Sequence, residues 1–389
     1  MQIEGPEHEE GCQPEYTRKK EVVLTGRVHP GETCGSFMME GFIKFITSQK
    51  LVAVELRKRC VFKIIPFTNP DGVIAGNYRV AFSGNDLNRQ YANPHPKLHP
   101  EVFSVKRLMA DSRQQCPDNI LAFIDMHAHS RKKNVFMYGP EFPIHDPRYF
   151  LARVIPKLLS ERSDIFRFYS CRFRVTKSKA TTARVVMQRE YGVLNSYTLE
   201  ASFHGFFTED RETIEFMPSH LYSLGEILSQ GLFENLLMTE DHERQTRERK
   251  ERQKRLAAAK QAGPAKGEES PSKVAGGTKT PDGRRQVKKA MIFDGPNKLA
   301  GHEDGVSEAS YHEYITSPTM QTESQPVQLN TESQPVRQSL MDRFNLQGRQ
   351  GRTLAMMSTE IHTEELKIQH QKNEGKTIDE EDVGSSDDQ

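Results

Sequence analysis

The first apolar run of the chain, residues 21–25 (EVVLT), leads directly into Arg27-Val28-His29-Pro30-Gly31-Glu32. A short apolar run that is closed by a Pro-Gly turn predicts a buried strand ending in a tight bend. An imidazole and a carboxylate three positions apart in such a bend can bind one metal ion from the same side. This stretch therefore predicts the start of a buried sheet and, at its end, two of the ligands of a metal site.

A third ligand is predicted at His127, which follows the apolar run at 120–126. Two ligands from one bend and one distant ligand leave a fourth position open, as catalytic zinc sites require. The His-x-x-Glu spacing alone is weak evidence, because a chain with 14 histidines is expected to contain about one by chance. A second match, from His362 to Glu365, lies in polar sequence with no strand before it. His129 shares the side of His127 in an extended segment and ranks below it as a ligand.

Apolar runs and amphipathic helical patterns alternate up to about residue 238. This alternation predicts an α/β fold with a mixed, mostly buried β-sheet flanked by helices. His29, His127 and Glu200 fall at or just beyond the ends of predicted strands, where such sheets bind ligands. The predicted strands are 21–25, 61–66, 120–126 and 193–199, and the predicted helices are 36–48, 101–112, 148–162 and a segment that starts at Ser219.

Composition divides the chain into parts of different character. Only 35% of its 389 residues are hydrophobic and the mean hydropathy is −0.70, which is too polar for one packed globule. We expect a flexible N-terminus at 1–19, a catalytic domain at 20–238, and a charged, low-complexity, largely disordered tail at 239–389. Within the tail, residues 240–260 favour a solvated helix over a basic interaction segment. A short helix is expected near 360–371.

Charge and cysteine content exclude several classes of protein. The net charge of +1 does not suit a general polyanion binder, so no nucleic acid is expected as a partner. The five cysteines are scattered and lack CxxC spacing, which indicates reduced thiols in the cytosol. The acidic N-terminus is no secretory signal, and no apolar stretch approaches ~18 residues, so no membrane is expected either.

Three polar groups could supply the chemistry that a metal needs around it. Glu200 is a candidate general base, although it could also be a solvated glutamate at the rim. Arg79 and the pair Asn88 and Arg89 follow the Asn-Pro-Asp-Gly turn at 69–72; guanidinium groups there suit a carboxylate or an oxyanion, or else they are solvated. Lys177, Lys179 and Arg184 form a basic cluster that could attract an acidic substrate, the alternative being a solvated loop.

Six segments, in this order, closely resemble the cytosolic carboxypeptidases. They are RVHPGE, NPDGVIAGNYR, DLNRQY, DMHAHSRKKNVFMYG, KATTARVV and NSYTLEASF. Members of this family are M14-type zinc peptidases that trim glutamates from polyglutamylated proteins, above all tubulin. The resemblance covers residues 20–237 and implies a zinc carboxypeptidase-like fold.

The resemblance also implies roles for individual residues. His29, Glu32 and His127 match the ligands of a single zinc ion, and Glu200 matches the general base. Arg79 matches the arginine that polarises the scissile carbonyl. Asn88 and Arg89 match the clamp for the terminal carboxylate. A basic residue, Arg184 first and Lys177 or Lys179 second, would select glutamate as the terminal side chain.

The implied activity is removal of C-terminal glutamate from acidic protein tails by a cytoplasmic enzyme, with tubulin or microtubules as partner and the cytoskeleton or cilium as a further location. The family carries a β-sandwich domain before the peptidase domain and further strands before the HPGE bend. Only about twenty residues precede the first predicted strand here, so we expect both to be missing. Two alternatives stay open: an inactive, truncated relative that binds microtubules or other partners, and a zinc deacylase of small N-acyl amino acids.

Overall fold

The computed structural model describes residues 2–3, 19–116, 118–208, 210, 212–261 and 353–373. Residues 1–255 and 339–389 belong to one compact unit, and residues 256–338 belong to a second. Of the second unit only 256–261 are described, as the last residues of a helix. The first unit holds the sheet and all of the candidate site residues.

The main sheet of the described residues has six strands in the order β1-β3-β2-β4-β6-β5. The inner strands β3, β2, β4 and β6 are parallel, whereas β1 and β5 are antiparallel to their neighbours at the two edges. A separate ribbon pairs β7 (Phe206–Phe207) with β8 (Thr213–Ile214). The strands of the main sheet are β1 (Gln2–Ile3), β2 (Lys20–Gly26), β3 (Cys60–Ile65), β4 (Ile120–His129), β5 (Val135–Tyr138) and β6 (Ser196–Ser202).

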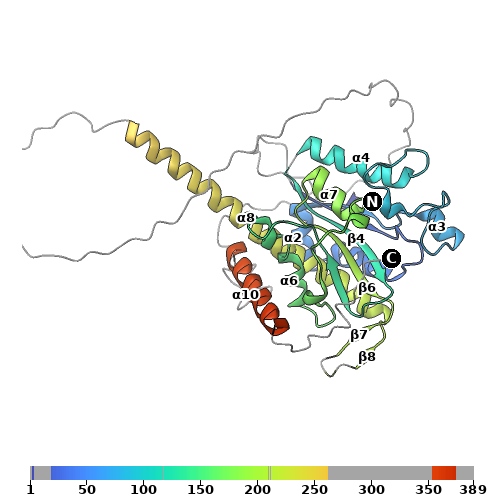
Figure 1. The fold of residues 1–389 in the computed structure, drawn as a ribbon. Coiled ribbons are helices and arrows are strands. Elements are labelled where there is room, and N and C mark those ends of the chain that lie inside the picture. Colours follow the sequence, from blue (N-terminus) through green and yellow to red (C-terminus); the bar gives the residue numbers. More distant parts are fainter. Residues whose placement is uncertain are drawn as a thin grey trace, which may run out of the picture. The chain divides into compact units, whose positions relative to one another are not determined.

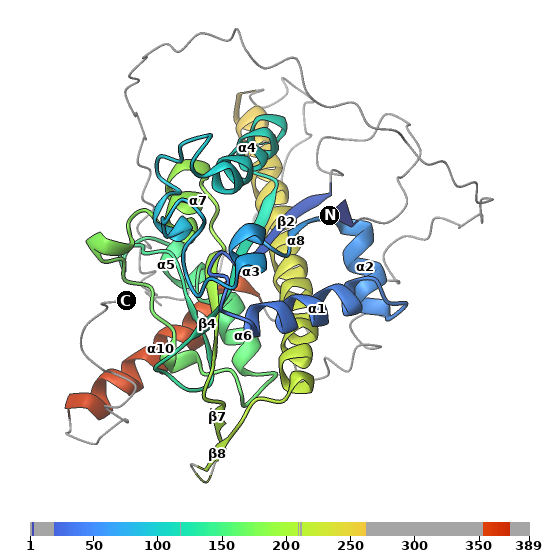
Figure 2. The same ribbon diagram turned by 90° about the vertical axis from the view of Figure 1, so that its right-hand side faces the viewer.

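Helices cover both faces of the sheet, as Figures 1 and 2 show from two sides. One face packs against α1 (Cys34–Ile46), α2 (Leu51–Arg59), α6 (Val154–Ser160) and α8 (Pro218–Gln261). The other face packs against α4 (Pro100–Gln115) and α7 (Ala183–Tyr191). The shorter elements are the helices α3 (Pro70–Ala75) and α5 (Arg148–Leu151) and the 3₁₀ turns η2 (Leu87–Arg89), η3 (Phe168–Ser170) and η4 (Lys177–Lys179). The last described helix is α10 (Leu354–Asn373). The predicted fold class, a buried mixed sheet flanked by helices, is confirmed.

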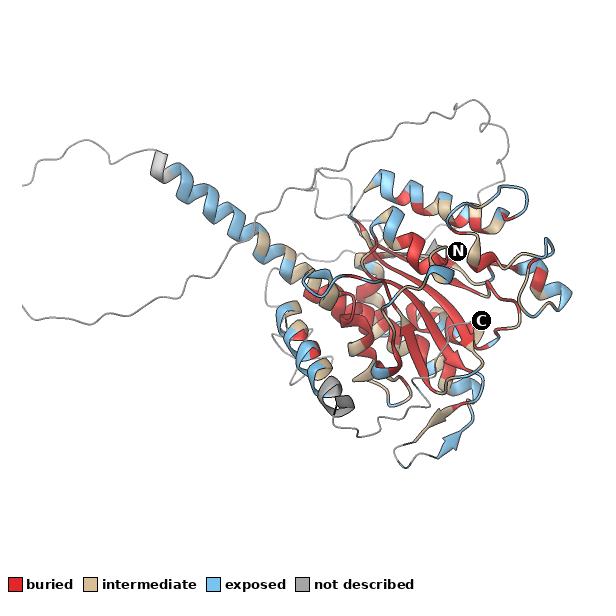
Figure 3. Cartoon of the chain, viewed as in Figure 1, coloured by how far each residue is buried: buried red, intermediate tan, exposed pale blue. Residues whose placement is uncertain are grey.

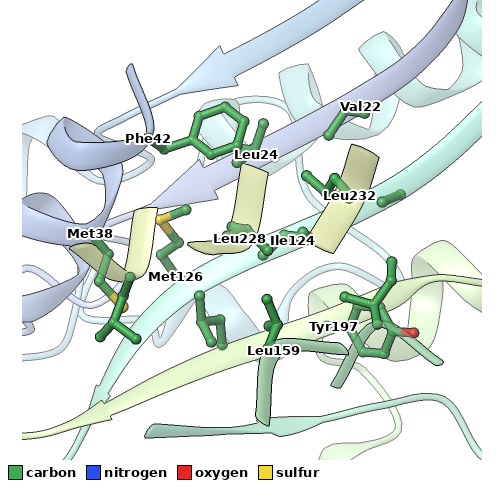
Figure 4. Close-up of a cluster of buried hydrophobic side chains, with 14 of the residues drawn as sticks. Val22, Leu24, Met38, Phe42, Ile124, Met126, Leu159, Tyr197, Leu228 and Leu232 are labelled. Carbon is green, nitrogen blue, oxygen red and sulfur yellow. The ribbon is translucent and has the colours of Figure 1, made fainter. Parts of the chain in front are cut away.

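Successive side chains of a strand point to opposite faces of the sheet, so one strand contributes to the cores on both faces. Val22 and Leu24 of β2 face the α1–α8 layer, whereas Val23 faces the α4–α7 layer. Figure 4 shows the first layer, where side chains of α1 and α8 meet those of β2 and β4. The strands are buried along most of their length in Figure 3, while α8 becomes exposed beyond residue 246. The sheet is therefore buried at the strand ends from which the candidate site residues extend.

Two boundaries differ from the sequence prediction for local reasons. The predicted helix 148–162 is broken into α5 and α6. Pro156 has no amide hydrogen to donate to the carbonyl of Ala152, and the hydroxyl of Tyr197 donates to that oxygen instead, at 2.8 Å. The predicted strand 193–199 begins three residues later, because α7 ends at Gly192 in the left-handed conformation.

Some elements were not predicted or extend further than predicted. The strand β5 and the helices α2 and α7 lie in segments for which the sequence predicted no element. The helix expected near 360–371 is present as the longer α10. α8 continues through residue 238 to Gln261, and Gln2–Ile3 of the N-terminal segment pair with β3 at the sheet edge. The other residues of 1–18, and those of the tail between 262 and 352, lie outside the described residues.

Candidate metal and catalytic site

The bend after β2 is held by its own backbone and by Arg27. Arg27 has a positive φ of 53°, which turns the chain sharply at the end of the strand. Its guanidinium donates to the carbonyl of Pro30 and, at 2.8 Å, to the hydroxyl of Ser36. The amide of Gly31 donates to the carbonyl of Tyr78 at 2.7 Å. These bonds fix the segment that carries His29 and Glu32.

The structure brings the three predicted metal ligands together. Nδ1 of His29 lies 2.6 Å from one carboxylate oxygen of Glu32, and Nδ1 of His127 lies 2.8 Å from the other. One candidate ligand atom from each residue lies within 4.8 Å of the other two, and all three residues are buried. Two imidazoles and a carboxylate are a usual donor set for catalytic zinc.

Each imidazole is oriented by a second carboxylate. Nε2 of His29 lies 3.1 Å from Asp86, and Nε2 of His127 lies 2.6 Å from Asp125. Asp125 also accepts a hydrogen bond of 2.7 Å from the hydroxyl of Thr25. Carboxylates in this position fix the tautomer of a metal-binding histidine, so both rings turn Nδ1 toward the centre. Neither aspartate was identified from the sequence, although Asp125 and His127 share one face of β4.

Sheet register places Glu200 next to the predicted metal ligands. In the parallel pairing of β4 with β6, His127 lies opposite Glu200. Glu200 is buried, and its Oε2 has no hydrogen-bond partner. An unpartnered buried carboxylate oxygen is unusual and calls for a ligand or a functional role. It therefore fits a site that is completed by a group outside the chain.

Burial and neighbouring charges shift the carboxyl pKa values in opposite directions. Burial raises the pKa of Glu200 to about 7, although nearby His127 works against this. Burial would also raise the pKa of Glu32, but His127 and His29 hold it well below its usual range. Asp86, which faces His29 and Arg79, has its pKa held low for the same reason. The site thus contains ionised carboxylates around a carboxyl that takes up a proton near neutral pH.

The carboxylates around His127 favour its protonated form in the metal-free protein. Burial opposes the charge, yet Asp125 and Glu32 raise the pKa of His127 well above its usual value. His129, the weaker ligand candidate, is not part of the cluster. Its ring lies 5.3 Å from that of Phe136, and burial lowers its pKa to about 4.

The polar residues predicted for substrate binding surround Asp86. Nε of Arg79 donates to Asp86 at 3.0 Å, and Nη2 of Arg79 lies 2.9 Å from the same carboxylate oxygen. The guanidinium also lies 3.9 Å from Glu32. Arg89 lies 3.9 Å from Asp86. Asn88 is buried, and its side-chain oxygen accepts from the amide of Ala183 at 2.9 Å. All three residues therefore lie beside the predicted metal ligands.

The three members of the predicted basic cluster occupy different environments. Arg184 is buried, donates to the carbonyl of Gly139 at 2.9 Å, and lies 5.4 Å from the ring centre of Tyr138. Lys179 is half-buried and acts electrostatically on His129. Lys177 is exposed. Burial of the cation distinguishes Arg184 from the two lysines.

The raised pKa of Glu200 predicts a pH dependence of stability in the metal-free protein. The unfolded chain releases this proton near pH 4.5, whereas the folded chain keeps it until about pH 7, so stability falls as the pH rises between these values. Relative to wild type, Glu200→Gln should therefore gain up to about 3 kcal/mol between pH 5 and pH 8. Urea unfolding in the presence of a chelator measures the free energy of unfolding of both proteins at pH 5 and at pH 8. If the difference between Glu200→Gln and wild type is the same at both pH values, the assignment is contradicted.

Comparison with known proteins agrees with this geometry. A family model described as zinc carboxypeptidase matches residues 2–216, and the chain belongs to this family. A crystal structure of a metallo-carboxypeptidase from Burkholderia cenocepacia superposes with a TM-score of 0.50 and 25% sequence identity, over 58% of this chain and 59% of the other. The zinc carboxypeptidase-like fold inferred from the sequence is thereby confirmed.

Within the family, the chain is similar to cytosolic carboxypeptidases, as its six segments indicated. It is 43% identical to cytosolic carboxypeptidase 1 of Gallus gallus over 215 residues, which are 51% of this chain and 17% of that protein. It is 43% identical to cytosolic carboxypeptidase 2 of Danio rerio over 216 residues, or 54% of this chain and 29% of the relative. The chain thus matches less than a third of the length of either relative. Among its described helices, none has the length and apolarity that a membrane crossing needs.

Proposed function

We propose that residues 20–238 form a zinc metallocarboxypeptidase that removes C-terminal glutamate from polyglutamylated or acidic-tailed proteins such as tubulin. The observation that carries this proposal is the combination of the His29–Glu32–His127 cluster with an unpartnered Glu200 carboxylate on the neighbouring strand. The similarity to proteins named cytosolic carboxypeptidases supports the cytoplasm as the location, and association with the cytoskeleton or a cilium would follow from such a substrate.

In this proposal Glu200 is the general base. A zinc ion held by His29, Glu32 and His127 would supply a Lewis acid that polarises a carbonyl and acidifies water. The Glu200 carboxylate accepts the proton of the attacking water and passes it to the departing amine. A pKa near neutrality suits both halves of this task.

Arginine and asparagine side chains would orient the substrate. Arg79 lies 3.9 Å from the predicted ligand Glu32. From this position its guanidinium would stabilise the negative charge that develops on the carbonyl oxygen. Arg89 and Asn88 lie on the turn η2 next to Asp86 and would bind the free carboxylate of the last residue. A clamp for that carboxylate restricts cleavage to the end of a chain.

Arg184 is the residue best suited to select glutamate. Its guanidinium is buried against the ring of Tyr138, and Lys132 lies 5.6 Å from the centre of the same ring. A buried cation is stabilised by an acidic side chain, which a solvated lysine such as Lys177 would attract only weakly. Lys179 contributes positive potential near the same approach.

Replacement of Arg184 tests this assignment of specificity. Arg184→Met should lower kcat/KM for a peptide ending in glutamate by about 10²-fold, since it removes a charge-assisted contact worth about 2–3 kcal/mol. For the same peptide ending in leucine, kcat/KM should stay equal or rise. The measurement compares both peptides in Arg184→Met and in the matched control Lys177→Met, in which the glutamate preference should be retained. Equal preferences in the two variants would reject Arg184 as the selecting residue.

A further inference from the structure

The second His-x-x-Glu segment, from His362 to Glu365, lies in α10 and makes a set of contacts unrelated to a metal. Glu365 accepts from Nε of Arg153 at 2.8 Å and from the hydroxyl of Tyr149 at 3.2 Å. Glu364 lies 2.6 Å from Nζ of Lys157 and accepts from Tyr169 at 2.5 Å. Two adjacent carboxylates of α10 thus contact two cationic side chains and two phenol groups from residues 149–169.

An apolar contact lies beside these polar ones. Met357 and Ile361 of α10 are fully buried, in one cluster with Val154 and Leu158 of α6. The ring of His362 packs edge-on against Phe150 of α5, with centroids 5.4 Å apart. The spacing of 357, 361, 364 and 365 places all four residues on one face of the helix. Both the polar and the apolar parts of this face are therefore complementary to α5, α6 and η3.

Arg153 connects this contact to the neighbourhood of Arg184. The Arg153 side chain is only 7% exposed, and its guanidinium lies 3.6 Å from the ring centre of Tyr149 and 4.1 Å from that of Phe173. The Phe173 ring in turn packs on Gly139, where a Cβ would come within 2.5 Å of it. The carbonyl of Gly139 is the one that accepts from Arg184.

We propose that α10 is a docking segment of this chain and that it binds the face of α5, α6 and η3 through Glu364 and Glu365. The bound helix positions Arg153 and Phe173 behind Arg184. Glu365 neutralises the buried guanidinium and keeps it between the two rings. Without this partner, Arg153 would turn toward water and Phe173 would lose its support. α10 is a positioning element in this scheme and does not contact substrate.

Amide hydrogen exchange on the full chain tests the docking. A single helix of this length is marginal in water, so exchange over 354–373 should speed up at least tenfold once docking is lost. We expect this loss in Glu364→Lys/Glu365→Lys. We expect no change in Lys367→Glu, a single charge reversal at an exposed position of the same helix. Unchanged protection in the double variant would overturn the docking.

A charge swap separates the specific contact from a general effect of charge. Glu364→Lys alone should speed up exchange, and adding Lys157→Glu should restore most of the protection, because the 2.6 Å ion pair re-forms with its signs exchanged. If the swap gives faster exchange than Glu364→Lys alone, the proposed pairing is wrong.

The positioning role rests on the proposed function and has its own readout. In Glu364→Lys/Glu365→Lys the ratio of kcat/KM for glutamate-ended over leucine-ended peptides should fall several-fold, with the zinc content unchanged. If the double variant releases the helix but the ratio of kcat/KM values is unchanged, the positioning role is wrong, whereas the proposed docking contact is still supported. A wild-type chain that cleaves neither peptide would reject the proposed function, whereas the exchange experiment would still decide the docking.

Discussion

Glu200→Gln is expected to lower kcat by about 10²–10⁴-fold, the usual contribution of a general base, while the protein keeps one zinc ion per chain. Glutamine has the shape of glutamate but cannot accept the proton of the attacking water. Because Glu200 lies opposite His127 in the sheet without being one of the three clustered ligands, its loss should leave metal binding intact. The variant should therefore separate proton transfer from metal binding.

Release of glutamate from a peptide ending in several glutamates measures this effect, with zinc determined by atomic absorption on the same samples. Glu21→Gln is the matched control, since Glu21 is also a buried glutamate of the sheet and pairs with Lys63 at 2.7 Å, at the start of β2. It makes the same chemical change at the opposite end of the strands, and kcat should stay within a few-fold of wild type. A Glu200→Gln enzyme as active as this control would show that another group is the base.

The three clustered candidate ligands and the inner strands could be predicted from the sequence because both depend on local patterns. EVVLT and the run before His127 are mostly apolar over the length of a strand, and a predicted ligand follows each within about four residues. Parallel strands bring their ends to one edge of the sheet, so the meeting of His29 with His127 follows from the fold class. The helix 36–48 was likewise evident from its apolar face and is present as α1.

The rest of the site depends on contacts between segments that are distant in the sequence. Asp86, which orients His29, is 57 residues away from it in the sequence. Asp125 is the one charged residue in the apolar run 120–126, and nothing in the sequence indicated that it orients His127. Arg184 was grouped with Lys177 and Lys179 because all three are basic, and only burial distinguishes them. The His362–Glu365 segment gave no sign of its partners, which lie more than 190 residues earlier in the chain.

The second large effect is expected when a metal ligand is removed. His127→Ala should bind no stoichiometric zinc and should show no peptidase activity, because two remaining ligands do not make a zinc site of this kind. Asp125→Asn should have a milder effect, a loss of about 10–100-fold in zinc affinity, since the aspartate orients the His127 ring without touching the metal. Competition titration against a chelator measures both.

The pH dependence of zinc binding distinguishes these roles further. In the metal-free protein, Asp125 and Glu32 raise the pKa of His127 well above its usual value, so zinc must displace a proton from this ring. Wild-type affinity should therefore rise with pH through neutrality. Asp125→Asn removes one of the two charges that hold this proton, so its affinity should depend less steeply on pH, even though it is weaker at every pH. A variant with the same pH dependence as wild type would mean that Asp125 does not control the protonation of His127, and the carboxylate would then act on ring orientation alone.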